Sequence, residues 1–120
     1  MAELTIWHNP NCSTSKFAVA RAEDAGVEFE LRKYMLKSER PSRDEIVTLL
    51  DQLEDPPTDL VRRDAKFKSY GISEADVATG EQVADVLAEH PELLQRPVLV
   101  KGGKAIIGRP KDRVDPFLAG

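Results

Sequence analysis

Apolar and polar residues follow two different periods along the first quarter of the chain. Residues 3–8 form a short apolar run around Ile6, which predicts a β-strand. Residues 13–25 carry a helical pattern that Gly26 closes, and residues 27–31 alternate between apolar and acidic side chains, which predicts a second strand. The order strand, helix, strand favours a right-handed crossover between two parallel strands.

Two longer helices are predicted in the middle of the chain, each starting at a capping box. Ser42 and Glu45 have the spacing of such a box, and apolar residues follow them at helical spacing. Thr79 and Gln82 repeat the arrangement, and Pro91 stops the helix that they begin.

The segment between these helices is interrupted by a Pro-Pro pair at positions 56 and 57. Residues 58–64 and 73–77 have low hydrophobicity and predict two short helical turns. We therefore interpret residues from about 42 to 90 as a helical insertion on the main fold.

The last quarter of the chain predicts a hairpin followed by a helix. Residues 97–100 form a buried type of strand, the glycines at 102 and 103 supply the turn, and residues 105–107 return as its partner. A closing helix is expected to begin near Pro116 or just before it.

The complete order of elements predicts an α/β fold of thioredoxin-like layout. Such a fold has a mixed four-stranded sheet with helices on both faces. A chain of 120 residues with 41% hydrophobic residues suits one compact core, so we assign residues 1–120 to a single domain.

Charge and cysteine content narrow the classes of function. The net charge of −4 argues against general nucleic-acid binding, although cations crowd positions 62, 63, 66 and 68 in a pattern typical of a solvated helix face. No stretch approaches the roughly 18 apolar residues of a membrane span, and the N-terminus lacks the regions of a secretory signal. We therefore expect a cytoplasmic monomer that binds neither nucleic acid nor a membrane.

Cys12 is the only cysteine, and it falls between the first predicted strand and the first predicted helix. A helix N-terminus stabilises a thiolate and binds anions, whereas an isolated thiol with a pKa of about 8.5 is only a few per cent ionised at pH 7. Ser13, Thr14 and Ser15 add short donors for the thiolate or for a bound oxyanion. The alternative is a small buried hydrophobic residue, but a polar turn is an unfavourable place to bury a thiol. We interpret Cys12 as a nucleophile beside an anion site.

A single cysteine excludes an intramolecular disulfide and a cysteine-rich zinc site. Serine stands at position 15, where a dithiol motif needs its second cysteine, so chemistry at one thiol is implied. A phosphatase-like loop would need an arginine in the following turn, where Ala18 and Val19 stand. The cations for an anion site must therefore come from elsewhere.

Three arginines have suggestive positions. Arg96 and Arg109 each precede a proline at the two open ends of the predicted hairpin, and antiparallel pairing should bring them together. Convergent guanidinium groups bind tetrahedral oxyanions because each donates two parallel hydrogen bonds. Arg62 lies in the helical insertion, which could fold over the same edge of the sheet. These features alone do not distinguish the three from ordinary surface arginines.

The two histidines have different contexts. His8 lies four residues before Cys12, where it could stabilise the thiolate as imidazolium or through hydrogen bonds, or could instead pack within the loop. His90, at a helix end, is interpreted as a surface cation. Their separation gives no metal-binding signature, so we expect no bound metal.

Four motifs stand in order along the chain: HNPNCSTSK at 8–16, LVRR at 60–63, QRPVLV at 95–100 and GRP at 108–110. Together they resemble the glutaredoxin-coupled arsenate reductases of the ArsC family, and the helix start at Ser42 also fits. The resemblance extends over nearly the whole chain.

The resemblance implies roles for particular residues. Cys12 would attack arsenate, and His8 would lower the pKa of the thiol. Arg62, Arg96 and Arg109 would hold the oxyanion. A cis peptide bond would precede Pro97.

The resemblance also implies a source of electrons. Glutathione would act as co-substrate with no cofactor bound, and glutaredoxin would resolve the resulting mixed disulfide. Two alternatives remain open within the same superfamily: a glutathione-dependent thiol oxidoreductase with another substrate, and a redox-sensing regulatory module of the Spx type. The absence of a second cysteine weakens the regulatory alternative, and the presence of Arg109 favours an oxyanion site.

Overall fold

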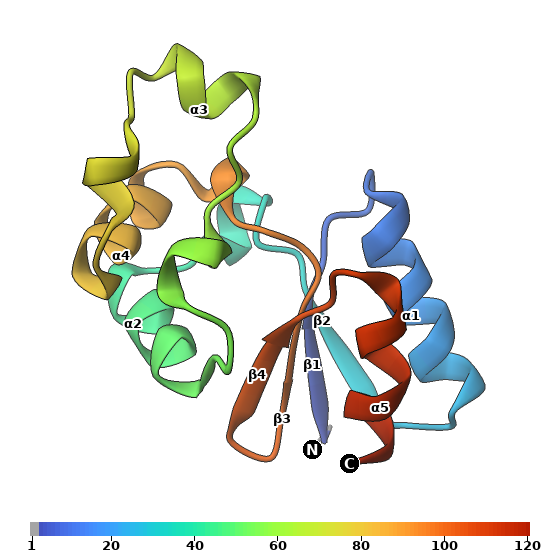
Figure 1. Cartoon of the computed structure of the whole chain (residues 1–120). Helices are drawn as coiled ribbons and strands as arrows, with labels where there is room; N and C mark the ends of the chain where they lie inside the picture. Colours follow the sequence, from blue (N-terminus) through green and yellow to red (C-terminus); the bar gives the residue numbers. More distant parts are fainter. Residues whose placement is uncertain (1–2) are drawn as a thin grey trace.

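A computed structural model, which describes residues 3–120, contains one mixed sheet (Figure 1). Its strand order is β2-β1-β3-β4, with β1 parallel to β2 and antiparallel to β3, and with β3 antiparallel to β4. The predicted mixed four-stranded sheet is confirmed. The strand bounds are β1 Leu4–Trp7, β2 Phe29–Arg32, β3 Val98–Lys101 and β4 Lys104–Ile107.

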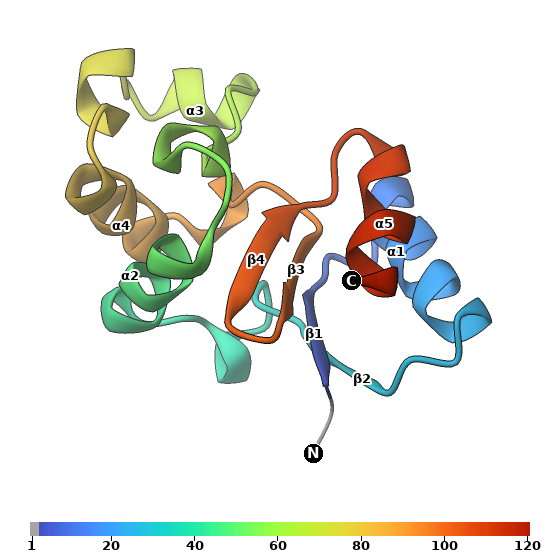
Figure 2. The same cartoon turned by 60° about the horizontal axis from the view of Figure 1, so that its bottom comes forward.

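Helices cover both faces of the sheet (Figures 1 and 2). On one side α1 (Ser13–Asp24) packs beside α5 (Val114–Ala119), and on the other α2 (Arg43–Gln52) packs beside α4 (Gly80–Glu89). A single turn of 3₁₀ helix (Lys111–Arg113) precedes α5, so the closing helix begins before Pro116.

Alternating side chains of the strands divide the core between these two layers. Leu4, Ile6 and Leu99 pack with α1 and α5, whereas Trp7 and Val98 pack with α2 and α4. Both sheet faces are therefore buried, which holds the ends of β1, β3 and β4 in fixed relative positions.

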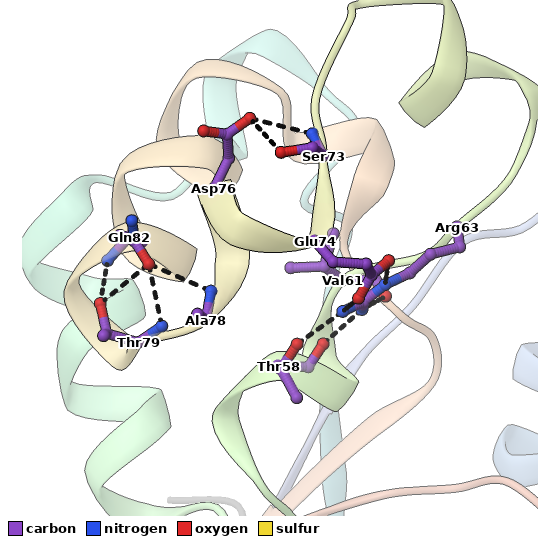
Figure 3. A network of polar contacts seen from close by, with 9 residues as sticks. All are labelled: Thr58, Val61, Arg63, Ser73, Glu74, Asp76, Ala78, Thr79 and Gln82. Atoms are coloured by element: carbon purple, nitrogen blue, oxygen red, sulfur yellow. Dashed lines mark hydrogen bonds and ion pairs between the residues drawn. The ribbon is translucent and has the colours of Figure 1, made fainter.

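Both predicted capping boxes are present. The backbone N–H of Glu45 donates to Ser42 Oγ at 3.2 Å, and that of Gln82 donates to Thr79 Oγ1 at 3.2 Å. Figure 3 shows the second box beside a third, unpredicted one at Ser73. These contacts satisfy N–H groups that a helix start would otherwise leave unpaired.

The predicted helical turn over residues 58–64 is wrong beyond position 60. A 3₁₀ turn spans Pro57–Leu60, and the chain then becomes extended, because Val61 forms an antiparallel bridge with Leu94. A separate short helix, α3 (Ala65–Ser69), follows and was not predicted. The second predicted turn is present as a 3₁₀ helix at Glu74–Val77.

Residues 60–63 and 93–96 form a short two-stranded ribbon that joins the helical insertion to the start of β3. The Arg62 N–H donates to the Leu93 carbonyl at 2.8 Å, and the Gln95 N–H donates to the Leu60 carbonyl at 2.7 Å. The ribbon places Arg62 beside the segment that carries Arg96, immediately before β3. None of the helices that residues 3–120 form is long and apolar enough to span a membrane.

Candidate active site

Cys12 is the N-cap residue of α1, in the turn that leaves β1. Its backbone is extended, with φ −108° and ψ 122°, and its carbonyl accepts the first helical hydrogen bond, from Lys16, at 3.0 Å. The free N–H groups of the first helical turn therefore point toward the thiol. The predicted position of Cys12 at a helix N-terminus is confirmed.

The thiol is buried, with only 8% of Cys12 exposed, which corrects the expectation that this polar turn would leave it accessible. The guanidinium of Arg109 donates from Nη2 to Cys12 Sγ at 3.2 Å. A buried sulfur that accepts a bond from a permanent cation is suited to exist as a thiolate.

Arg96 and Arg109 meet at the open end of the β3–β4 hairpin, as predicted. Arg109 Nε donates to the Arg96 carbonyl at 2.6 Å, and the strands continue their pairing through a 2.8 Å bond from the Gly108 N–H to the Pro97 carbonyl. The main chain of one arginine thus fixes the guanidinium of the other. This contact aims Arg109 at the sulfur.

The pKa of the Cys12 thiol is lowered from 9.0 to about 7 by competing influences. Burial raises it, but the Ser15 N–H, the Arg96 side chain, the Thr14 N–H and the charge of Arg109 together lower it by more. At neutral pH about half of the thiol is therefore ionised, against a few per cent for an unperturbed thiol.

This pKa predicts how Cys12 reacts with pH. Only the thiolate is alkylated, and its fraction grows as pH rises through the pKa. We expect the alkylation rate with iodoacetamide to reach half its maximum at a pH of about 7, as measured by mass spectrometry. A midpoint in the range of an unperturbed thiol, about 8.5 to 9.0, would contradict the geometry described above.

Arg62 and Arg96 line a small cavity of about 240 Å³, which Asn9 also lines. Arg62 Nη1 lies 3.4 Å from the Asp64 carboxylate, and Asp64 also caps α3 by accepting from the Phe67 N–H at 3.1 Å. The structure therefore brings the third predicted arginine to the same region, although through an extended segment rather than a helix.

Two buried side-chain atoms within residues 3–120 have no hydrogen-bond partner in the protein, namely Nε of Arg96 and Nδ1 of His8. Unpaired buried polar atoms are rare in folded proteins and call for a specific explanation. Arg96 Nε is a cationic donor in a residue that lines the small cavity, so a bound anion would satisfy it.

The three residues that follow Cys12 contribute mainly through their backbone. The N–H groups of Thr14 and Ser15 lower the pKa of the thiol, and both residues are buried. The Ser15 hydroxyl accepts from the Asn9 N–H at 3.4 Å, which ties the loop to the helix. Ser13 is exposed. The hydroxyl groups of Ser13 and Thr14 make no hydrogen bond within residues 3–120.

His8 is buried at the end of β1, and its pKa lies below 6.5 because burial disfavours the charged form and because Lys33 and Lys16 repel it. The imidazole is therefore neutral at pH 7, and a charge on His8 does not account for the lowered pKa of Cys12.

His90 stacks on Tyr70 with ring centroids 4.1 Å apart, at the end of α4.

Three residues of this region were missed from the sequence. Asn9 and Asp64 line the small cavity, and the hydroxyl of fully buried Tyr34 lies within hydrogen-bond reach of Arg96. Burial raises the pKa of Tyr34 to about 12, although Arg96 and Arg62 oppose the rise, so its hydroxyl stays neutral. Of the three, only Asp64 has a sequence feature that could have identified it, because aspartate is a preferred N-cap residue.

Residues 3–120 contain no cluster of three or more His, Cys, Asp or Glu side chains that could hold a metal.

Comparison with known proteins places this geometry in a family. The family model described as "ArsC family" matches residues 7–117. The chain belongs to the ArsC family. Its match to that model contains Cys12 and all three arginines of the site.

Individual relatives agree with this assignment. The ArsC-family chain is 30% identical to an arsenate reductase of Neisseria meningitidis, with 98% of this chain and 100% of that protein covered. It is 36% identical to an uncharacterized protein in the glnII region of Streptomyces viridochromogenes, over 97% and 99% of the two chains. The solved arsenate reductase of Vibrio cholerae superposes with a TM-score of 0.82 at 30% identity, covering 94% and 95%. The thioredoxin-like fold is therefore confirmed.

The ends of the hairpin in this ArsC-family chain contain two cis peptide bonds. The bond between Arg96 and Pro97 is cis, as the resemblance implied, and the bond between Arg109 and Pro110 is also cis, which was not predicted. Both arginines of the hairpin therefore directly precede a cis-proline.

Gly108 allows the close approach of the two hairpin ends. A Cβ at this position would lie 2.8 Å from Pro97 Cγ and 2.9 Å from Leu99 Cδ1, distances that require the hairpin end to move. We expect Gly108→Ala to lower the free energy of unfolding by about 1–3 kcal/mol and to weaken the Arg109 contact with Cys12. Gly80→Ala is the matched control, since its Cβ would meet only Pro57 at 4.0 Å. Equal Tm values for the two variants would contradict the steric argument.

Proposed function

We propose that this protein reduces arsenate to arsenite through the Cys12 thiolate. The observation that carries the proposal is the bond from Arg109 Nη2 to Cys12 Sγ at 3.2 Å, which places a nucleophile directly beside a donor for an oxyanion. Support also comes from the relatives named arsenate reductase that match nearly the whole chain.

In the proposed first step, arsenate binds between Arg62, Arg96 and Arg109. The unpaired Nε of Arg96 and the N–H groups of Thr14 and Ser15 supply further donors. The Cys12 thiolate forms a sulfur–arsenic bond and displaces hydroxide, which leaves a thiol–arsenate adduct. His8 is neutral, so its proposed contribution is to orient the loop rather than to supply charge.

External thiols must supply both electrons, because Cys12 is the only cysteine of the chain. Glutathione attacks the adduct, arsenic leaves as arsenite, and Cys12 is left in a mixed disulfide that glutaredoxin resolves. The reducing environment that this chemistry needs is that of the cytoplasm. We propose that the protein acts there as a monomer.

Protection of Cys12 by arsenate tests the oxyanion site separately from turnover. The native protein is alkylated with iodoacetamide at pH 7, with and without arsenate, and modification of Cys12 is followed by mass spectrometry. Arsenate is expected to slow alkylation at least about ten-fold at saturation, because binding occupies the donors around the sulfur. Alkylation at the same rate with and without arsenate would refute the site and favour a thiol oxidoreductase with another substrate.

A further inference from the structure

The loop that carries Arg109 is held by an ion pair that lies outside the active site. This loop comprises residues 108–110, between the end of β4 and the 3₁₀ turn that precedes α5 (Figure 1). The ion pair joins Asp55 Oδ1 to Arg113 Nη1 at 2.9 Å. The Asp55 side chain is 15% exposed, against 56% for Asp115 in its pair with Arg21. Solvent and salt therefore weaken the first pair less than the second.

Arg113 binds the main chain of the loop at several points. Its Nη1 donates to the Ile107 carbonyl at 2.9 Å and to the Arg109 carbonyl at 3.3 Å. Its backbone N–H donates to the Pro110 carbonyl at 3.1 Å. One residue therefore holds the main chain on both sides of Arg109.

Asp55 holds Arg113 and the end of β4 together through its two carboxylate oxygens. Oδ1 pairs with Arg113, and Oδ2 accepts from the Ile107 N–H at 2.9 Å. The chain after α2 runs beside β4, because the Glu54 N–H donates to the Ala105 carbonyl at 2.9 Å, and this contact brings Asp55 to its place. Asp55 and Arg113 together form a clamp on the loop.

The position of this loop decides where the Arg109 guanidinium lies. That group donates from Nε to the Arg96 carbonyl at 2.6 Å and from Nη2 to Cys12 Sγ at 3.2 Å. Hydrogen bonds weaken steeply outside a narrow range of distance and angle. A shift of the Arg109 main chain would therefore weaken the bond to the sulfur.

We propose that Asp55 and Arg113 are positioning residues, which hold the Arg109 main chain where its guanidinium meets Cys12 Sγ. They act through Arg109, which bonds the sulfur itself. A thiolate is less stable when its cationic donor moves away, so the clamp controls how readily Cys12 ionises. The inference rests on the proposed function only for its effect on turnover, since ionisation of Cys12 is measured without arsenate.

Asp55→Ala separates positioning from a direct effect of charge, because the two predict opposite signs. Loss of a negative charge by itself favours the thiolate and would move the midpoint of Cys12 alkylation to lower pH. Loss of the clamp should instead raise the midpoint by at least about 0.5 pH units, which slows alkylation at pH 7 about two-fold. The measurement is the rate of Cys12 modification by iodoacetamide as a function of pH, followed by mass spectrometry.

Combined substitutions test whether the clamp acts through Arg109. In the Arg109→Ala background, Asp55→Ala should cause no further rise of the midpoint, because the group that it positions is absent. Arg113→Ala should raise the midpoint as Asp55→Ala does. Arg113→Lys, which keeps the charge and can donate to the same carbonyls, should recover part of that rise.

Arg21→Ala and Asp115→Ala are the matched controls. They remove an exposed pair that joins α1 to α5, with Arg21 Nε 2.8 Å from Asp115 Oδ1, and should leave the midpoint unchanged. Circular dichroism and Tm verify that each variant is folded. If Asp55→Ala does not fold, Asp55→Asn takes its place, since it removes the charge but keeps one acceptor oxygen, and a smaller rise is expected.

The inference is overturned if the midpoint is unchanged or lower in a folded Asp55 variant, if the controls show an equal rise, or if Asp55→Ala raises the midpoint further in the Arg109→Ala background. In turnover, kcat/KM for arsenate should fall about two- to ten-fold in Asp55→Ala, less than in Arg109→Ala. Failure of the native protein to reduce arsenate would refute the proposed function. The alkylation midpoints would still decide whether the clamp positions Arg109.

Discussion

Cys12→Ser is expected to abolish arsenite release, with a loss of at least about 10³-fold, because the serine hydroxyl is not ionised at neutral pH and forms no mixed disulfide. No other cysteine exists in the chain to replace the nucleophile. The measurement is arsenite production, resolved from arsenate by chromatography, at equal concentrations of native and variant protein.

The control is oxyanion binding by the same variant. Serine preserves a small polar side chain at the N-cap of α1, and the three arginines remain in place. Arsenate should therefore still raise the Tm of Cys12→Ser, which shows that the site is intact. Residual arsenite release close to the native rate would mean that another group performs the reaction.

Arg109→Ala is the substitution of a charged residue with the largest expected effect. It removes the bond to Cys12 Sγ and one of the donors proposed for the oxyanion. The pKa of Cys12 should rise above about 7, because Arg109 contributes to lowering it. We expect kcat/KM for arsenate to fall about 10²–10³-fold, the range found when a donor to a developing anion is removed. The midpoint of Cys12 alkylation should move to higher pH.

Two further variants define what Arg109 supplies. Arg109→Lys keeps the charge but loses the planar fork that bonds both Sγ and the Arg96 carbonyl, so an intermediate loss is expected. Arg43→Ala, which removes an exposed arginine paired with Asp85, is the matched control and should leave both measurements unchanged. An alkylation midpoint that does not move in Arg109→Ala would show that the guanidinium does not stabilise the thiolate.

Local sequence signals predicted much of the fold and part of the site. The capping boxes at Ser42 and Thr79 and the Gly-Gly turn act through neighbours within a few residues, so a sequence pattern is sufficient to locate them. The same hairpin reasoning correctly placed Arg96 beside Arg109, because antiparallel pairing fixes which ends meet.

Features that depend on distant contacts were not predictable in this way. The ribbon that holds Arg62 depends on a bridge between Val61 and Leu94, and a local pattern gave a helical turn instead. The hydrogen bond to Cys12 Sγ comes from Arg109, which is 97 residues further along the chain. Resemblance to a known family singled out Arg62, Arg96 and Arg109, because a family pattern reflects contacts between distant residues. The sequence of one short segment does not contain that information.

The proposed reduction of arsenate is tested most directly by a coupled assay with the native protein. NADPH oxidation is followed with glutathione, glutaredoxin and glutathione reductase present, and arsenite is quantified in the same samples. The account predicts NADPH oxidation that requires arsenate, yields one arsenite for each NADPH, and disappears in Cys12→Ser. No arsenate-dependent oxidation by native protein whose Cys12 is shown to be reduced and free would contradict the account.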